Sequence, residues 1–216
     1  MPDAPTKKRI LCLHGLRTNT TVMEFQITGL KLALGSEVEF ISVNAPMTVD
    51  ADPEIVAVFG DAGPWYAWYR PALFGKYEGL DRSIRFVEDV IARNGPFDAI
   101  LGFSQGALMA TILTARMQNT IQDPEKYLWR GVILACGPSI NDKGKATYNF
   151  KKLQFPSIHI AGKEDKAYKA SLELTELYDA KDRHLFEHSG GHQFPSPFVK
   201  NPIYDEISAA IRKMIH

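Results

Sequence analysis

The stretch FDAILGFSQGALMATILTARM, residues 97–117, decides how we interpret the rest of the chain. An apolar run of strand length ends at Leu101, and Ser104 then stands between Gly102 and Gly106. Apolar residues with helical spacing follow directly. A strand, a tight turn and a helix in succession form the repeating unit of parallel sheets that are covered by helices. The stretch therefore predicts such a unit, with Ser104 at its turn.

The same alternation continues on both sides of this stretch. Further apolar runs typical of buried strands occupy residues 9–15, 38–46, 131–138, 157–163 and 183–189. Helical patterns lie near 22–34, 79–93, 105–118, 167–180 and 203–215. We therefore expect an α/β fold with a mostly parallel central sheet and helices on both faces. No interdomain linker is visible, so we expect one domain over residues 1–216, with a flexible tail at 1–8.

One segment, residues 44–78, breaks this alternation. It has no clean period, and its part PWYAWYRPALFGKY (64–77) is rich in aromatic residues. The six rings belong to Trp65, Tyr66, Trp68, Tyr69, Phe74 and Tyr77. A connection of this length without regular structure is usually functional or mobile. We treat it as an aromatic-rich insertion, whose rings either line a pocket or cover the core or a dimer interface.

Composition excludes several classes of protein. The chain has 25 basic and 25 acidic residues, which argues against a nucleic-acid partner because phosphate binding needs surplus Lys and Arg. Cys12 and Cys136 both lie in apolar runs, so we expect no disulfide framework and a reducing, cytoplasmic setting. No segment reaches 18 consecutive apolar residues, so we expect no membrane span. The first nine residues lack the apolar core of a secretion signal.

Residues 102–106 fit the pattern G-x-S-x-G of a nucleophile elbow. The pattern is meaningful only between a strand and a helix, which is its context here. In such an elbow a side chain at Gly102 or Gly106 would collide with neighbouring backbone, and the helix N-terminus faces any oxyanion that forms at the serine. Ser104 is therefore the candidate nucleophile. The alternative is an ordinary glycine-rich turn with an incidental serine.

A serine nucleophile needs a base, and the base needs an orienting acid. In α/β-hydrolases the chain order is serine, acid, histidine. Asp165 follows the strand at 157–163, and His192 follows the strand at 183–189 in a glycine-rich loop. Both lie at the strand ends where open α/β sheets place their active sites. We prefer Asp165 as the acid, with the adjacent Glu164 as the alternative.

The oxyanion formed during acyl transfer needs backbone N–H donors. In this fold one donor is the residue after the nucleophile, here Gln105. The second comes from the loop after an early strand, and the segment LHGLRTN favours Leu16 or Arg17.

The remaining histidines receive structural roles. His14 is expected to shape the loop after the first strand, and His159 lies inside a strand. His184, His188 and His192 would share one face of a helix and resemble a metal site, but the surrounding residues favour a strand, and we predict no metal.

These segments together resemble a known family. GPFDAILGFSQGA, LHGLRTN, YEGLDRSI and EHSGGHQFP are similar to the eukaryotic serine hydrolases called FSH, over nearly the whole chain from Arg9. The resemblance implies an α/β-hydrolase that cleaves carboxylic esters or thioesters without a cofactor. It matches Ser104 to the nucleophile, Asp165 to the acid and His192 to the base. Tyr168 stands where the family commonly has valine.

The family includes cytosolic esterases and fungal thioesterases that release polyketides, so both remain open for this chain. Acyl-protein thioesterases also carry GFSQG, but their opening loop and acid region match less well. A catalytically silent member that only binds a ligand is the alternative of another class. We expect a small-molecule acyl ester or thioester as substrate, with a medium-length or aromatic acyl group preferred over acetate. Its candidate contacts are Trp65, Trp68, Tyr69 and Phe103, and a homodimer is compatible with the aromatic segment.

Overall fold

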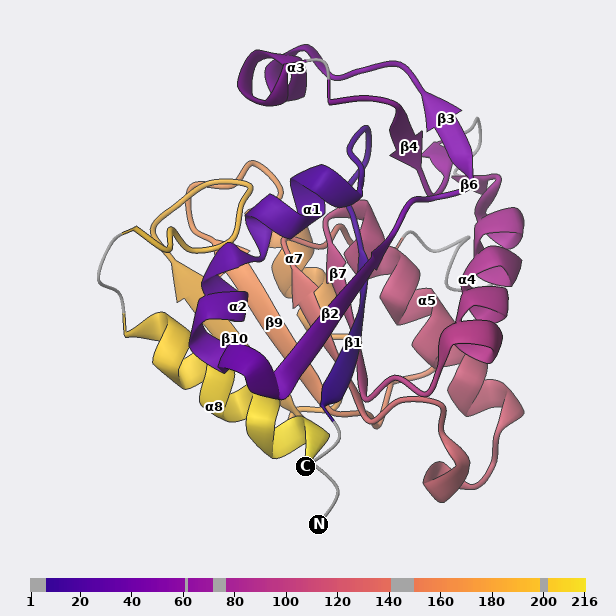
Figure 1. The fold of residues 1–216 in the computed structure, drawn as a ribbon. Helices are drawn as coiled ribbons and strands as arrows, with labels where there is room; N and C mark the ends of the chain where they lie inside the picture. The colour runs from indigo at the N-terminus through magenta and orange to yellow at the C-terminus, as the bar shows by residue number, and fades with distance from the viewer. Residues whose placement is uncertain (1–6, 61, 72–76, 141–149, 199–201) are drawn as a thin grey trace, which may run out of the picture.

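The structure is a computed structural model that describes residues 7–60, 62–71, 77–140, 150–198 and 202–216. Its centre is a six-stranded sheet in the order β10-β9-β8-β7-β1-β2, with every neighbouring pair parallel (Figure 1). The strands are β1 (Lys8–Leu13), β2 (Val38–Val43), β7 (Ala99–Phe103), β8 (Gly131–Ala135), β9 (Ser157–Gly162) and β10 (Arg183–His188). Five of the six fall within the predicted strand ranges, that of β7 being residues 97–103, and β1 begins one residue before its range, at Lys8. The predicted α/β class with a mostly parallel sheet is confirmed.

Helices cover both faces of this sheet, as predicted (Figure 1). They are α1 (Thr20–Gln26), α2 (Thr28–Leu34), α4 (Leu80–Asn94), α5 (Gln105–Thr120), α7 (Tyr168–Thr175) and α8 (Ile203–Ile215), with short 3₁₀ helices η1 (Gly35–Glu37) and η3 (Pro124–Lys126). Alternate residues of β1 enter two different cores. Leu11 and Leu13 pack in the core on the side of α4 and α5. Ile10 and Cys12 pack in the core on the side of α2 and α8. The strand is apolar throughout because both of its faces are buried.

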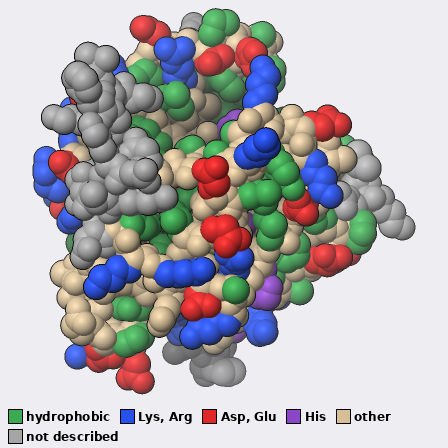
Figure 2. Space-filling view, turned by 180° about the vertical axis from the view of Figure 1, so that it is seen from behind, with side chains coloured by type: hydrophobic (Ala, Val, Ile, Leu, Met, Phe, Trp, Pro, Cys, Tyr) green, Lys and Arg blue, Asp and Glu red, His purple; other side chains and the backbone are tan. Residues whose placement is uncertain are grey.

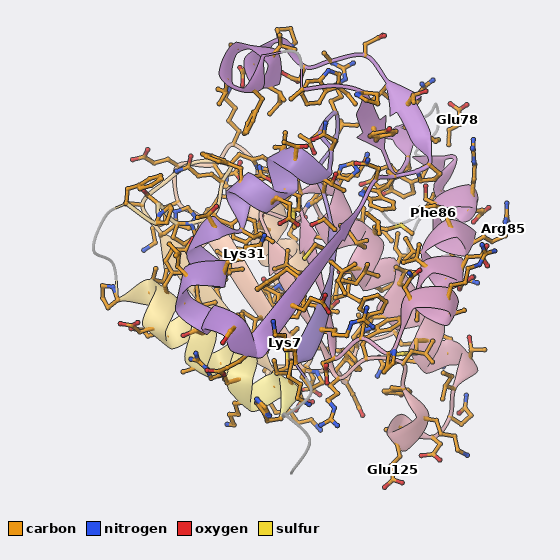
Figure 3. All side chains as sticks on the ribbon, in the orientation of Figure 1. Lys7, Lys31, Glu78, Arg85, Phe86 and Glu125 are labelled. Carbon is orange, nitrogen blue, oxygen red and sulfur yellow. The ribbon has the colours of Figure 1, made fainter. Side chains whose placement is uncertain are left out.

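Helix α4 shows how spacing predicts burial. In the segment predicted as a helix near 79–93, four apolar residues recur at three- and four-residue spacing and Asn94-Gly95 follows as a stop, and the helix ends at Asn94. The four positions, all buried, are Leu80, Ile84, Val87 and Ile91. Figure 3 shows Phe86 on the side of α4 that faces the sheet and Arg85 on its outer side.

Two helix predictions differ from the structure. The range 22–34 contains two helices, α1 and α2, which meet at the fully buried Ile27. The range 167–180 contains only α7, which ends at Thr175. The chain turns there because Tyr178 enters the core, where it is fully buried and its hydroxyl lies 3.1 Å from Thr111 Oγ1. Tertiary packing overrides the local pattern in both places.

The insertion has more regular structure than its sequence predicts. β3 (Met47–Val49) pairs antiparallel with β4 (Trp65–Ala67), and α3 (Pro53–Phe59) lies between them in the chain. β5 (Arg70–Pro71) pairs antiparallel with β6 (Tyr77–Glu78). Figure 1 shows α3, β3 and β4 beyond the carboxyl ends of the sheet strands. Phe74 lies outside the described residues.

The N-terminal boundary also differs from the expected tail at 1–8. β1 begins at Lys8, whose ammonium lies 3.1 Å from a carboxylate oxygen of Asp98. Residues 1–6 lie outside the described part of the chain, and a single domain over 1–216 stays a prediction. Within the described ranges no helix combines the length and apolar character needed to cross a bilayer. On the face seen in Figure 2, basic and acidic side chains are interspersed.

Candidate active site

Ser104 occupies the turn between β7 and α5 and is half-buried. Its φ angle is 51°, in the left-handed region that a side chain rarely adopts. A Cβ on Gly102 would lie 2.3 Å from the Gly106 carbonyl oxygen. A Cβ on Gly106 would lie 2.0 Å from the Leu13 carbonyl oxygen. Both glycines are therefore required by close backbone contacts on either side of the strained serine.

A continuous chain of hydrogen bonds links Ser104 to His192 and Asp165. His192 Nε2 lies 2.9 Å from Ser104 Oγ, and His192 Nδ1 lies 2.7 Å from Asp165 Oδ2. The other carboxylate oxygen of Asp165 accepts the backbone N–H of Ala167 at 2.8 Å. An ionised carboxylate only accepts, so it holds the proton of a neutral imidazole on Nδ1 and leaves Nε2 free to accept from Ser104. This is the protonation pattern of a general base.

Burial and direction favour Asp165 over Glu164 as the candidate acid. The Asp165 side chain is 3% exposed and points to His192, whereas Glu164 is exposed. The backbone N–H of Glu164 donates to the Gly190 carbonyl at 3.1 Å. Glu164 therefore ties the acid loop to the histidine loop through its backbone and does not approach the imidazole with its carboxylate.

A second histidine shapes the loop that carries His192. His188 Nδ1 accepts the backbone N–H of Gly190 at 3.1 Å, so its Nε2–H donates to the Gln193 carbonyl at 3.0 Å. At the end of β9, a Cβ on Gly162 would lie 2.1 Å from the Gly191 carbonyl oxygen. His184 and His188 both lie in β10, which agrees with the predicted strand and excludes a shared helical face.

The loop after β1 passes beside the serine. A Cβ on Gly15 would lie 3.5 Å from Ser104 Cβ. The backbone N–H groups of Leu16 and Gln105 donate to no acceptor among the described residues, which leaves them available to an oxyanion. The N–H of Arg17 donates instead to the Tyr66 carbonyl at 2.9 Å. The prediction that Arg17 supplies an oxyanion donor is therefore wrong for this conformation, and Leu16 remains the candidate.

Buried hydrogen bonds anchor this loop to the insertion. The side chain of Gln105 accepts from Trp68 N at 2.8 Å and donates to the Tyr69 carbonyl at 2.7 Å. The Trp68 indole N–H donates to the His14 carbonyl at 2.8 Å. Sequence reasoning missed this role of the Gln105 side chain, for which a polar residue directly before the apolar residues 106–110 of α5 is the available signal.

His14 is a neutral structural residue, as expected. Its Nε2 accepts the Ala45 backbone N–H at 3.0 Å, and its Nδ1–H therefore donates to the Gly15 carbonyl at 2.7 Å. Burial lowers the pKa of His14 from 6.5 to about 4. Burial likewise lowers the pKa of His159, inside β9, to about 3.

The four predicted substrate contacts are mostly packing residues. Trp68 has no exposed surface, and Trp65 and Tyr69 are 8% and 5% exposed, so these rings fill the core rather than line a pocket. The Phe103 ring packs 5.1 Å from the His192 ring and supports the imidazole from below the surface. Large aromatic rings bury much apolar surface, and here they contribute to the core.

A pocket does border the loop after β1. Its volume is about 450 Å³. Its lining residues, four of them charged, are Leu16, Arg17, Val49, Asp50, Asp52 and Arg70. It lies between the loop beside Ser104 and the insertion, which makes it the candidate substrate pocket.

One further group beside the serine could hold a metal. Cys136 Sγ, a carboxylate oxygen of Asp165 and a ring nitrogen of His192 all lie within 4.8 Å of one another. No cofactor is needed for the chemistry that the hydrogen-bonded chain supports.

Comparison with known proteins shows the family of the chain. The family model described as Serine hydrolase (FSH1) matches residues 2–200. The chain belongs to this serine hydrolase family. The predicted resemblance is thus confirmed, and with it the expectation of a hydrolase that acts on ester bonds.

Relatives and solved structures extend the comparison. The chain is 30% identical to Esterase FPY3 of Fusarium mangiferae, over 96% of each chain. It is 26% identical to the dihydromonacolin L-[lovastatin nonaketide synthase] thioesterase of Aspergillus terreus, over 88% of this chain and 86% of that one. The crystal structure of a carboxylesterase from Mesorhizobium loti superposes with a TM-score of 0.62 at 15% identity, over 96% of this chain and 89% of that one. At 15% identity, the similarity to the Mesorhizobium loti structure shows the fold alone.

Three buried histidines, His14, His159 and His188, make the free energy of unfolding depend on pH, and burial lowers the pKa of each; the first two have the lowest values. Their folded pKa values of about 4 and about 3 lie below the unfolded value of 6.5, so the unfolded state binds more protons as the pH falls. The stabilisation that comes from keeping these histidines neutral is fully present well above pH 6.5. It is lost progressively as the pH falls from 6.5 towards the folded pKa values of about 4 and about 3. We expect each of His14 and His159 to remove on the order of 2 kcal/mol between pH 6.5 and 5.

Urea unfolding at both pH values, on the wild type and on His159→Gln, measures this effect. The variant should lose the share that His159 contributes, on the order of 2 kcal/mol between pH 6.5 and 5, and keep the shares of His14 and His188. An unchanged pH dependence in the variant would show that His159 is protonated in the folded protein.

Proposed function

We propose that this protein hydrolyses carboxylic esters or thioesters through Ser104, His192 and Asp165 and an acyl-enzyme intermediate. The observation that carries the proposal is the unbroken hydrogen-bond chain from Ser104 Oγ through His192 to Asp165. Membership of the serine hydrolase family supports it. A binding protein without catalysis has no need for a strained serine aligned with a base and a buried acid.

In the first step Ser104 Oγ attacks the carbonyl carbon and His192 Nε2 takes the hydroxyl proton. Asp165 stabilises the imidazolium that results. The N–H groups of Gln105 and Leu16 donate to the oxyanion of the tetrahedral intermediate, and one such donor is typically worth about 10²–10³ in rate. The intermediate collapses, and His192 gives its proton to the departing alcohol or thiol.

In the second step water attacks the acyl group on Ser104. His192 takes one proton of the water, and the second tetrahedral intermediate releases the acid and returns the proton to Ser104. Every proton transfer uses His192 Nε2, which exchanges protons first with Ser104 and the leaving group and then with water. The side chain of His192 is 43% exposed, which leaves room for the water.

We assign the acyl group to the pocket beside Leu16, because that pocket borders the loop that would hold the oxyanion. Its four charged residues favour an acyl chain with a polar group over a purely apolar one. Both ester and thioester substrates suit this arrangement. The similarity to a thioesterase of Aspergillus terreus supports a thioester substrate. Two buried free cysteines support a cytoplasmic setting. The cytoplasmic setting and the homodimer both stay predictions.

Kinetics on 4-nitrophenyl esters test the catalytic roles. Ser104→Ala and His192→Ala should each lower kcat by about 10⁴–10⁶, and Asp165→Asn by about 10⁴. Glu164→Gln is the matched control and should keep kcat within about twofold, because its carboxylate is exposed and does not contact His192.

Equal losses of kcat in Asp165→Asn and Glu164→Gln would contradict the assignment of Asp165 as the acid. A folded wild type that hydrolyses neither esters nor thioesters would replace the hydrolase by the ligand-binding alternative.

A chain-length series of the same esters tests the pocket. Val49→Phe narrows the pocket, and Val58→Phe adds the same bulk on α3, where Val58 is 72% exposed and does not line it. We expect Val49→Phe to lower kcat/KM for longer acyl groups about tenfold or more and to leave acetate nearly unchanged. Val58→Phe should behave like the wild type. A uniform loss across the series would place the acyl group elsewhere.

A further inference from the structure

The thiol of Cys136 lies beside the proposed acid and base. Cys136 follows β8 with a φ angle of 50°, and its backbone N–H donates to the Ile160 carbonyl at 2.9 Å. The residue is fully buried, and its S–H donates to the Gln193 carbonyl at 3.4 Å. A left-handed conformation costs a side-chain-bearing residue roughly 1–2 kcal/mol. The surrounding hydrogen bonds therefore hold the thiol in this position against local strain.

The three side chains offer one sulfur, one oxygen and one nitrogen to a common centre. Cys136 Sγ, an Asp165 oxygen and a His192 ring nitrogen lie within 4.8 Å of one another. Zinc binds thiolate sulfur at about 2.3 Å and imidazole nitrogen or carboxylate oxygen at about 2.1 Å, so its ligand atoms stand roughly 3.5 Å apart. The cluster can close on an ion through shifts of about an ångström. A serine, histidine and aspartate alone would supply only hard or borderline ligands, whereas the thiol selects thiophilic ions.

An ion can reach this centre from the histidine side. The His192 side chain is 43% exposed, and its loop contains Gly190 and Gly191, of which Gly191 has open space at its Cβ position. Solvent on the same side can provide a fourth ligand.

We propose that Cys136, Asp165 and His192 form an inhibitory site for a thiophilic divalent cation such as Zn²⁺ or Cd²⁺. The site rests on the proposed function, because it regulates the same serine, histidine and aspartate. It adds Cys136 as a residue of the active centre that ester hydrolysis itself does not use.

The inhibition follows from proton positions. A metal ion bound to His192 Nδ1 uses the lone pair of that nitrogen, so the single imidazole proton moves to Nε2. Nε2 then faces Ser104 as a donor and cannot accept the hydroxyl proton. The Cys136 thiol releases its proton to solvent on forming the metal–sulfur bond, and Asp165 binds the metal in place of the imidazole N–H. A histidine held in the wrong tautomer costs about 10⁴ in kcat in a serine protease.

Cadmium is the probe, because a cadmium–thiolate bond has a charge-transfer band in the ultraviolet. The wild type, Cys136→Ala and the matched control Cys12→Ala are titrated with Cd²⁺, and absorbance and ester hydrolysis are followed together. Cys12 is the other buried free cysteine; it lies in β1, in the same core as Cys136, but outside the group that Cys136 forms with Asp165 and His192. We expect one Cd²⁺ per chain, a band that tracks inhibition, and reversal of both by a chelator.

The variants separate the outcomes. Cys136→Ala should lose the band and need at least about tenfold more Cd²⁺ for half-inhibition relative to its own metal-free rate, whereas Cys12→Ala should match the wild type. If Cys136→Ala does not fold, His192→Ala tests the same site, since it keeps the thiol and should bind Cd²⁺ at least about tenfold more weakly. A band lost in Cys12→Ala, or inhibition that persists in Cys136→Ala at the same Cd²⁺ concentration, overturns the site.

The proposed function can fail separately. Active protein that shows neither the band nor inhibition overturns the metal site and leaves the hydrolase intact. Protein that binds Cd²⁺ through Cys136 but hydrolyses no ester or thioester keeps the cation site and overturns the hydrolase and the inhibitory role.

Discussion

The close contact of α5 with the end of β1 is the constraint on which the site depends. At Gly106 the helix backbone lies so near the carbonyl oxygens of Leu13 and His14 that no Cβ fits between them. This contact forces the preceding turn into the strained conformation of Ser104. It also brings the loop after β1 beside the serine, because β1 continues directly into that loop. The proposed nucleophile and the proposed oxyanion donors are thus positioned by the same packing contact.

The insertion is joined to this contact by buried hydrogen bonds. Gln105 binds the backbone at Trp68 and Tyr69, and Trp68 binds the backbone at His14. Each of these bonds is buried, so breaking one leaves a backbone group unsatisfied at a cost of about 1–3 kcal/mol. Trp68 and Tyr69 therefore hold the insertion against the loop after β1, and the proposed substrate pocket is lined mostly by charged residues.

The sequence predicts well what depends on local pattern. Apolar runs identified all six sheet strands, and the chain order of serine, acid and histidine identified three side chains that the fold brings within hydrogen-bonding distance. It predicts poorly what depends on packing between distant segments. The break at Ile27, the buried rings at Trp68 and Tyr69 and the bond from Arg17 to Tyr66 all arise from contacts that no local period encodes. The approach of Cys136 to Asp165 is of the same kind, since it joins the ends of β8 and β9.

The most direct test of the account is covalent labelling by a fluorophosphonate, located by peptide mapping. The account predicts one label per chain, on Ser104, and no label on Ser104→Ala or on His192→Ala within the time that saturates the wild type. Only a serine activated by a correctly oriented imidazole reacts at such a rate. A label on another residue, or an unlabelled wild type that is folded, would contradict the claim that Ser104 is the nucleophile of this protein.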